Sequence, residues 1–181
     1  MAQKTSGVTF RLDDNLLSRL RMESTQKQMS LNTLASQVFQ SHADYEIYAS
    51  RAGMVSFPKS LLIRIMDKLN DDEVTKLSEY IAENEIKDFV LLMNQEYSIW
   101  ALLKTIDSWL RATGFVYRHE VTLENHNVHV FVINHAMGKR WSLYFEKLFK
   151  FCLNDLGHKS TEFDVTDSSI AFKVNISDYM K

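Results

Sequence analysis

Histidine is concentrated in one short stretch of this 181-residue chain, where imidazole side chains could bind a metal ion. Four of the six histidines, His119, His126, His129 and His135, lie within seventeen residues. Neutral imidazole is a common ligand for zinc, nickel and copper. If the surrounding apolar runs form a hairpin, His119 and His129 become diagonal neighbours on one face. These two are the candidate metal ligands, but histidines on a sheet surface are usually solvated, and we expect no resident metal.

The loop that follows this stretch brings three basic residues together. His135, Lys139 and Arg140 lie around Gly138, just before a predicted helix. The free N–H groups at the start of a helix attract anions. These three residues could therefore bind a carboxylate or phosphate effector. The simpler interpretation is that Gly138 turns the chain, Trp141 enters the core and the two cations face water.

The residues typical of an enzyme are not found in any familiar arrangement. The chain lacks a phosphate-binding glycine loop, a zinc-protease helix motif and a serine-nucleophile elbow. The single cysteine, Cys152, lies among Phe149, Phe151 and Leu153 in a predicted helix. That setting is typical of a buried structural thiol. The sequence therefore does not indicate an enzyme and implies no cofactor.

Residues 96–181 must position these side chains, and their patterning predicts an α+β domain. Two helices, from Ser98 to Gly114 and over 139–156, are each followed by two strand-like runs. The runs are Phe115–Leu123 and Val128–Ile133, then Ser160–Val165 and Ile170–Val174. The order helix, strand, strand thus occurs twice, as in a duplicated unit. Two hairpins joined edge to edge predict a four-stranded antiparallel sheet with both helices on one face, a two-layer sandwich.

Residues 45–95 have the periodicity of helices. One helix is expected to stop near Gly53, another to start around Pro58, and a third to start at Asn70 with acids in its first turn. The run Ile86–Met93 fits a helix or a buried strand, and we favour the helix. We interpret this region as a helical connector.

The first forty-odd residues predict a strand and two helices. Residues 8–12 alternate apolar and polar side chains, as a strand with one buried face does. Asp13 is a candidate N-cap for a helix over about 14–27, and Ser30 for a second helix with an apolar stripe.

Residues 8–40 resemble the ribbon-helix-helix family of transcriptional regulators. The matching residues are V-T-F-R-L-D-D-N-L-L-S-R-L from Val8 and S-L-N-T-L-A-S-Q-V-F from Ser30. The resemblance implies that residues 1–44 form a DNA-binding domain in which the strand pairs with its mate across a homodimer. A ribbon of two strands fits the major groove of double-stranded DNA.

The resemblance also implies which residues contact DNA. Gly7, Thr9 and Arg11 would face the base edges, and Arg11 could form a bidentate pair with guanine, which discriminates by roughly 1–3 kcal/mol. Phosphate contacts are implied at the start of the second helix and on the N-terminal arm. The candidates there are Lys4, Lys27, Ser30, Asn32 and Thr33.

The bulk properties limit the partners of the chain. A formal net charge of −2 excludes nucleic-acid binding through bulk charge, so any DNA contact must be local. There is no apolar run of membrane-spanning length, and we expect a soluble, cytoplasmic protein. Two alternatives stay open: a protein-interaction or antitoxin-like module that uses the N-terminal fold only to dimerise, and a sensor of a metal or small ligand.

Overall fold

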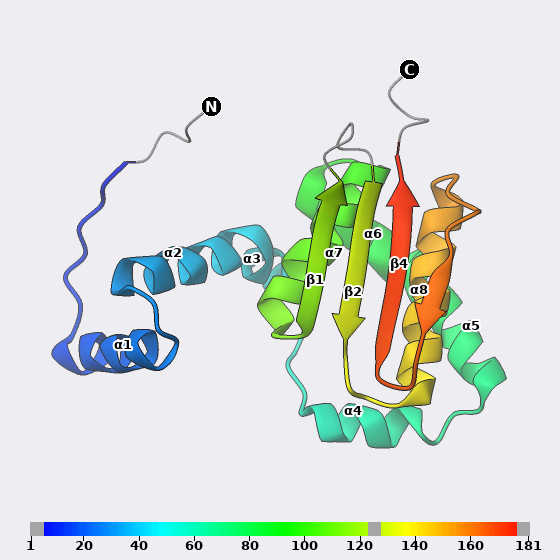
Figure 1. The fold of residues 1–181 in the computed structure, drawn as a ribbon, viewed down its shortest axis with the longest axis horizontal. Coiled ribbons are helices and arrows are strands. Elements are labelled where there is room, and N and C mark those ends of the chain that lie inside the picture. Colours follow the sequence, from blue (N-terminus) through cyan, green and yellow to red (C-terminus); the bar gives the residue numbers. More distant parts are fainter. Residues whose placement is uncertain (1–5, 123–127, 177–181) are drawn as a thin grey trace. The chain divides into compact units, whose positions relative to one another are not determined.

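The chain is divided into two compact units in a computed structural model, which describes residues 6–122 and 128–176. The first unit extends to His42 and the second begins at Ala43. The predicted α+β class is confirmed (Figure 1). The elements are α1 (Asp14–Gln26), α2 (Leu31–Ser41), the π-helical η1 (His42–Glu46), α3 (Ile47–Arg51), α4 (Lys59–Met66), α5 (Asp71–Ile81), the π-helical η2 (Ala82–Ile86), α6 (Lys87–Asn94), α7 (Ile99–Thr113), β1 (Val116–Thr122), β2 (Val128–Asn134), α8 (Lys139–Asp155), β3 (Phe163–Val165) and β4 (Ser169–Asn175).

Both helices of the first unit begin at the capping residues that the sequence predicts. The Asp13 carboxylate accepts the N–H of Asn15 at 2.9 Å, at the start of α1. The Ser30 hydroxyl accepts the N–H of Thr33 at 3.0 Å, at the start of α2. Each cap satisfies one of the amides that have no carbonyl partner inside the helix.

The predicted N-terminal strand is not present in the single chain. Among the described residues of the first unit, 6–13 are neither helix nor strand. A strand exists only when its backbone hydrogen-bonds to a neighbour, and the ribbon expected here needs the same segment of a second chain. The alternation of residues 8–12 therefore gives an unpaired segment in one copy.

The second unit is built on a four-stranded antiparallel sheet with the strand order β1-β2-β4-β3 (Figure 1). The two hairpins thus meet edge to edge through β2 and β4, as predicted. Along β2, His129, Phe131 and Ile133 are buried, whereas Val130 and Val132 on the other face are partly exposed. One face of the sheet therefore carries the core.

Helices α6, α7 and α8 lie behind the sheet in Figure 1, on the face that carries the core, and α5 packs against α8. Their side chains form one apolar cluster with those of the strands, including Leu102 of α7, Leu153 of α8 and Phe172 of β4. Ala82 and Val90, from the region expected to be a connector, belong to the same cluster. The helical middle is thus packed into the second unit, and its run Ile86–Met93 is helical as favoured.

The last hairpin is shorter on one side than the sequence predicts. A strand was expected over Ser160–Val165, but β3 covers only Phe163–Val165. The hydroxyl of Thr161 donates to the carbonyl of His158 at 3.0 Å, which holds these residues in a turn after Gly157. None of the described helices combines the length and the apolar character that a membrane span needs.

Candidate functional site

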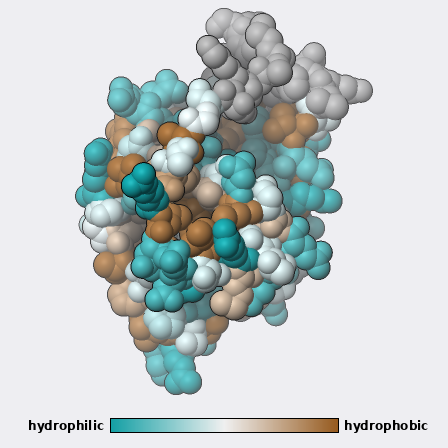
Figure 2. Space-filling view, turned by 90° about the vertical axis from the view of Figure 1, so that its left-hand side faces the viewer, coloured by the Kyte–Doolittle hydropathy of each residue, from teal (hydrophilic) through white to brown (hydrophobic). Residues whose placement is uncertain are grey.

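The N-terminal unit exposes the apolar side chains that the sequence assigns to a core. Val8, Phe10 and Leu12 are 73%, 57% and 45% exposed. The ring of Phe10 lies 5.3 Å from that of Phe39 on α2, and Phe39 and Val38 are themselves half exposed. Figure 2 shows one face of the molecule, on which hydrophobic side chains gather among hydrophilic ones. We call these five residues the apolar face of the first unit.

The predicted base-reading residues lie on the same segment as Phe10 and are exposed. Gly7, Thr9 and Arg11 alternate with the apolar residues, and each is open to solvent. No atom lies within 4 Å of the place where a Cβ on Gly7 would be. In the described segment, Gly7, Thr9 and Arg11 are therefore accessible to a DNA duplex.

The predicted phosphate-binding residues differ in how far they are already engaged. Ser30, Asn32 and Thr33 are exposed at the start of α2, where the Ser30 and Thr33 hydroxyl oxygens are 2.7 Å apart. The Lys27 ammonium forms an ion pair with Glu23 at 2.7 Å. Exposed pairs of this kind contribute little stability, so DNA phosphate can compete for Lys27. Lys4 lies outside the described residues.

The basic loop before α8 does not assemble an anion site from His135, Lys139 and Arg140. His135 is fully buried, and its Nδ1 accepts the N–H of Met137 while its Nε2 lies 3.0 Å from the Ser142 hydroxyl. Arg140 pairs with Asp71 at 3.3 Å, and Lys139 is exposed.

The loop is instead a structural element that closes the end of the sheet. Gly138 precedes α8 with φ of +91°, a conformation that favours glycine. The indole N–H of Trp141 donates to the carbonyl of Leu62, which anchors the start of α8. The Ser142 hydroxyl donates to the carbonyl of Thr166, so the hydrogen on His135 resides on Nε2 and points to Ser142. The turning role of Gly138 thus agrees with the simpler interpretation.

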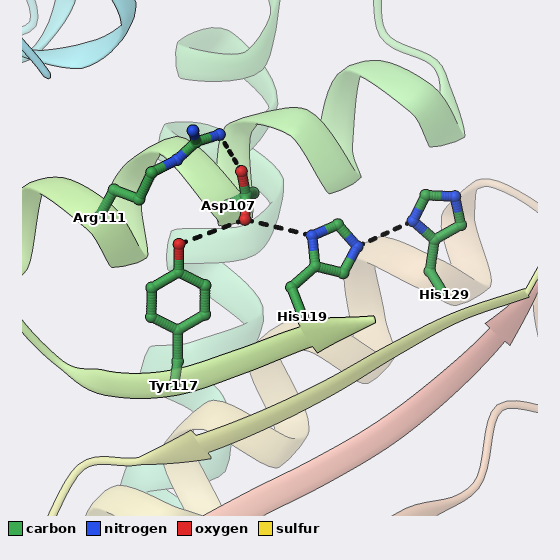
Figure 3. Close-up of polar contacts among 5 residues, drawn as sticks. All are labelled: Asp107, Arg111, Tyr117, His119 and His129. Atoms are coloured by element: carbon green, nitrogen blue, oxygen red, sulfur yellow. Dashed lines mark hydrogen bonds and ion pairs between the residues drawn. The ribbon is translucent and has the colours of Figure 1, made fainter. Parts of the chain in front are cut away.

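His119 and His129 are in direct contact, on one face of the β1–β2 hairpin as the register predicts (Figure 3). The Nε2 atom of His119 lies 2.9 Å from the Nδ1 atom of His129. On its other side, His119 Nδ1 lies 3.1 Å from the Asp107 carboxylate of α7. Asp107 also accepts the Tyr117 hydroxyl at 3.4 Å and pairs with Arg111. We call these five residues the histidine cluster.

The hydrogen bonds of the histidine cluster fix where its protons lie. Asp107 accepts, so His119 donates from Nδ1, and its Nε2 then accepts the N–H of His129 Nδ1. His129 is left with a lone pair on Nε2, which is buried and without a hydrogen-bond partner in the described structure. Burial, and next the neighbouring His119, lower the pKa of His129. His129 is therefore neutral at physiological pH.

The histidine cluster joins α7 to β1 of the sheet through the contact of Asp107 with His119. The described residues hold no group of three or more His, Cys, Asp or Glu side chains placed to bind a metal ion. The cluster includes no serine, threonine or cysteine that His119 could activate as a nucleophile. Sequence reasoning missed Asp107, Arg111 and Tyr117. Asp107 and Arg111 are four residues apart on one helix face, and this was the available signal.

Comparison with known proteins gives no relative. No family model matches the chain, and neither the curated proteins nor the solved structures include a significant match.

Proposed function

We propose that this chain is a sequence-specific DNA-binding transcriptional regulator that acts as a homodimer, with a ribbon of residues 8–12 in the major groove. The observation that carries the proposal is the exposure of Val8, Phe10 and Leu12 beside two correctly capped helices. An apolar face on so small a unit needs a partner, since about forty residues rarely bury enough surface to fold alone.

A second copy of the same segment would satisfy both needs of residues 8–12. Two antiparallel copies would pair their free backbone groups and bury their apolar side chains against α2 of either chain. Thr9 and Arg11 alternate with those side chains, so the paired ribbon would present them together on its outer face. The exposed N-terminus of α2 would hold a flanking phosphate through its free amides.

The local charge of the unit fits this role. Arg11, Arg19, Arg21 and Lys27 are all exposed within the described part of the first unit, although the whole chain is slightly acidic. Phosphate contacts supply affinity for any DNA, and base contacts supply the choice of sequence. Arg11 is the residue that we assign to sequence choice.

The experiment is selection of bound duplexes from a random DNA pool at two salt concentrations, followed by affinity measurement on the selected site. We expect a short palindrome, bound less tightly at the higher salt concentration. Arg11→Ala should lower affinity for that site by roughly tenfold to a hundredfold while sparing the fold.

Arg19→Ala is the matched control, because it removes the same charge from α1 and not from the ribbon. It should weaken binding to all sequences alike and by a smaller factor. If a dimeric protein enriches no sequence at either salt concentration, the proposal is wrong. If Arg11→Ala binds the selected site as tightly as the unchanged protein, the assigned readout face is wrong.

A further inference from the structure

The second unit contains an apolar cavity of about 140 Å³ among its helices. Its walls come from η2, α6, α7, α8 and the segment from η1 to just beyond α3. Aromatic and aliphatic side chains make up most of the lining, among them Phe89, Ile106, Trp109 and Phe149. The cavity is partly open, since Met54 of its wall is 43% exposed, so apolar side chains of the wall are left for an occupant to cover.

The polar atoms at the wall are already satisfied or weakly engaged. The Thr105 hydroxyl donates to the carbonyl of Ala101 at 2.8 Å and accepts the Asn94 amide at 2.9 Å. The Tyr45 hydroxyl donates only to the thioether sulfur of Met54, at 3.4 Å, which is a weak acceptor. A bound water needs two to four polar partners, and these walls do not supply them.

The residues that line the cavity include no Asp, Glu, Lys, Arg or His, so a charged occupant would find no counter-charge among them. Burial raises the pKa of the Cys152 thiol to about 12, so the thiol is neutral. Burial also raises the pKa of Tyr45, which keeps its hydroxyl as a donor. A charged molecule would lose its hydration without gaining a counter-charge from these residues.

We propose that this cavity is the binding site of a small uncharged effector, with one aromatic ring or a comparably small aliphatic body, and one hydrogen-bond acceptor that faces Tyr45. An apolar cavity of about 150 Å³ is known to accept benzene in another protein, so the space suffices for one ring. Binding sites of this kind are mostly apolar, with few polar groups that set orientation.

Two local irregularities of the backbone point to the same place. Tyr45 belongs to η1 and Ile86 to η2, the two π-helical segments of the described chain, and both side chains line the cavity. Single-turn π segments occur frequently at functional sites, because they cost stability and persist where they serve a purpose.

The position of Tyr45 and Met54 in the sequence suggests how an occupant of the cavity could regulate DNA binding. Both belong to the segment that directly follows the first unit, and the cavity holds them against α7 and α8. An occupant would stabilise this segment, and it would thereby change DNA affinity if the two states of the segment bind DNA differently. This regulatory part rests on the proposed function, whereas the binding site does not.

The test uses the full-length protein and three probes of equal ring size: benzene, anisole and benzoate. We expect benzene and anisole to bind saturably, with one site per chain in calorimetry, and to raise the thermal midpoint. Benzoate should not bind. Anisole carries an ether oxygen, so Tyr45→Phe should weaken anisole by roughly two- to tenfold and leave benzene unchanged.

Cys152→Leu places added volume into the cavity and should weaken benzene by roughly tenfold or more, with a thermal midpoint no lower than that of the unchanged protein. Cys152→Ala is the matched control, because it alters the same wall without filling the space, and it should retain benzene binding. Absence of saturable benzene binding, or equal binding to the filled variant, overturns the site. DNA affinity with and without anisole is measured separately, so a chain that binds anisole but no DNA contradicts only the proposed function.

Discussion

At the scale of single residues, the second unit keeps two histidines neutral by burying them. His129 is nine-tenths buried in the histidine cluster, and His135 is wholly buried under the loop before α8. Burial lowers the pKa of both, with His119 adding to the effect on His129 and Lys59 to that on His135. In the unfolded chain both return to a pKa near 6.5. Acid therefore favours unfolding, because below pH of about 6.5 these two histidines bind protons more readily in the unfolded chain than in the folded chain.

The free energy of unfolding of the second unit should change little between about pH 6.5 and about pH 8, and it should fall below about pH 6.5, down to the lowered pKa values of the folded state. His129→Asn should make the fall shallower, because the amide can still donate to His119 Nε2 but does not titrate. The measurement is urea unfolding across this pH range. His42→Asn, at an exposed histidine outside the second unit, is the control and should retain the slope of the unchanged protein. An identical slope in His129→Asn would show that this histidine does not govern the acid response.

At the scale of elements, helix ends follow from local sequence. Asn70 forms a capping box with Glu73: its side-chain Oδ1 accepts the backbone N–H of Glu73 at 3.0 Å, and the Glu73 carboxylate accepts the backbone N–H of Asn70 at 2.8 Å. Asn70→Ala should lower the free energy of unfolding by about 0.5–2 kcal/mol, measured by chemical denaturation. Asn84→Ala, which loses only an exposed bond to the Tyr80 carbonyl, should stay within about 0.5 kcal/mol. Equal losses would mean that the box does not stabilise α5.

Features that depend on packing were harder to predict than those that depend on neighbours in sequence. Gly114 ends α7 with φ of +69°, and a glycine after an apolar helix stripe predicts this. The hairpin register predicted that His119 and His129 lie close together. The contact of Asp107 with His119 depends on how α7 is rotated against the sheet, which cannot be predicted from the local sequence. His135 looked like a surface residue, because its burial depends on Ser142 and on a backbone bond to Ser168. The cavity likewise depends on packing, because Tyr45 lines it together with Phe89 of α6 and Phe149 of α8, which are far from it in the sequence.

At the scale of the whole molecule, the two units differ in how complete they are. The second unit buries a continuous apolar cluster that one chain supplies, and it is expected to fold by itself. The first unit leaves its apolar face exposed, and in the described part of the chain residues 8–12 belong to no sheet. Its stability should therefore depend on protein concentration, as for any element shared between two copies.

Two substitutions at adjacent positions of the proposed ribbon test whether two copies pair through residues 8–12. Phe10→Asp places a carboxylate on the apolar face, so the shared core should not form, and amide protons of residues 8–12 should exchange freely with solvent. Thr9→Asp adds the same charge to the opposite face. It should keep the exchange protection of a paired ribbon and lose DNA binding, because its carboxylate would enter the groove of a negatively charged duplex. Hydrogen exchange measured by mass spectrometry compares the variants with the unchanged protein, and the signals of residues 43–176 report whether the second unit is intact.

If Phe10→Asp keeps protection over residues 8–12 equal to that of Thr9→Asp, the two copies do not pair through this segment. The DNA-binding ribbon would then lack its structural basis.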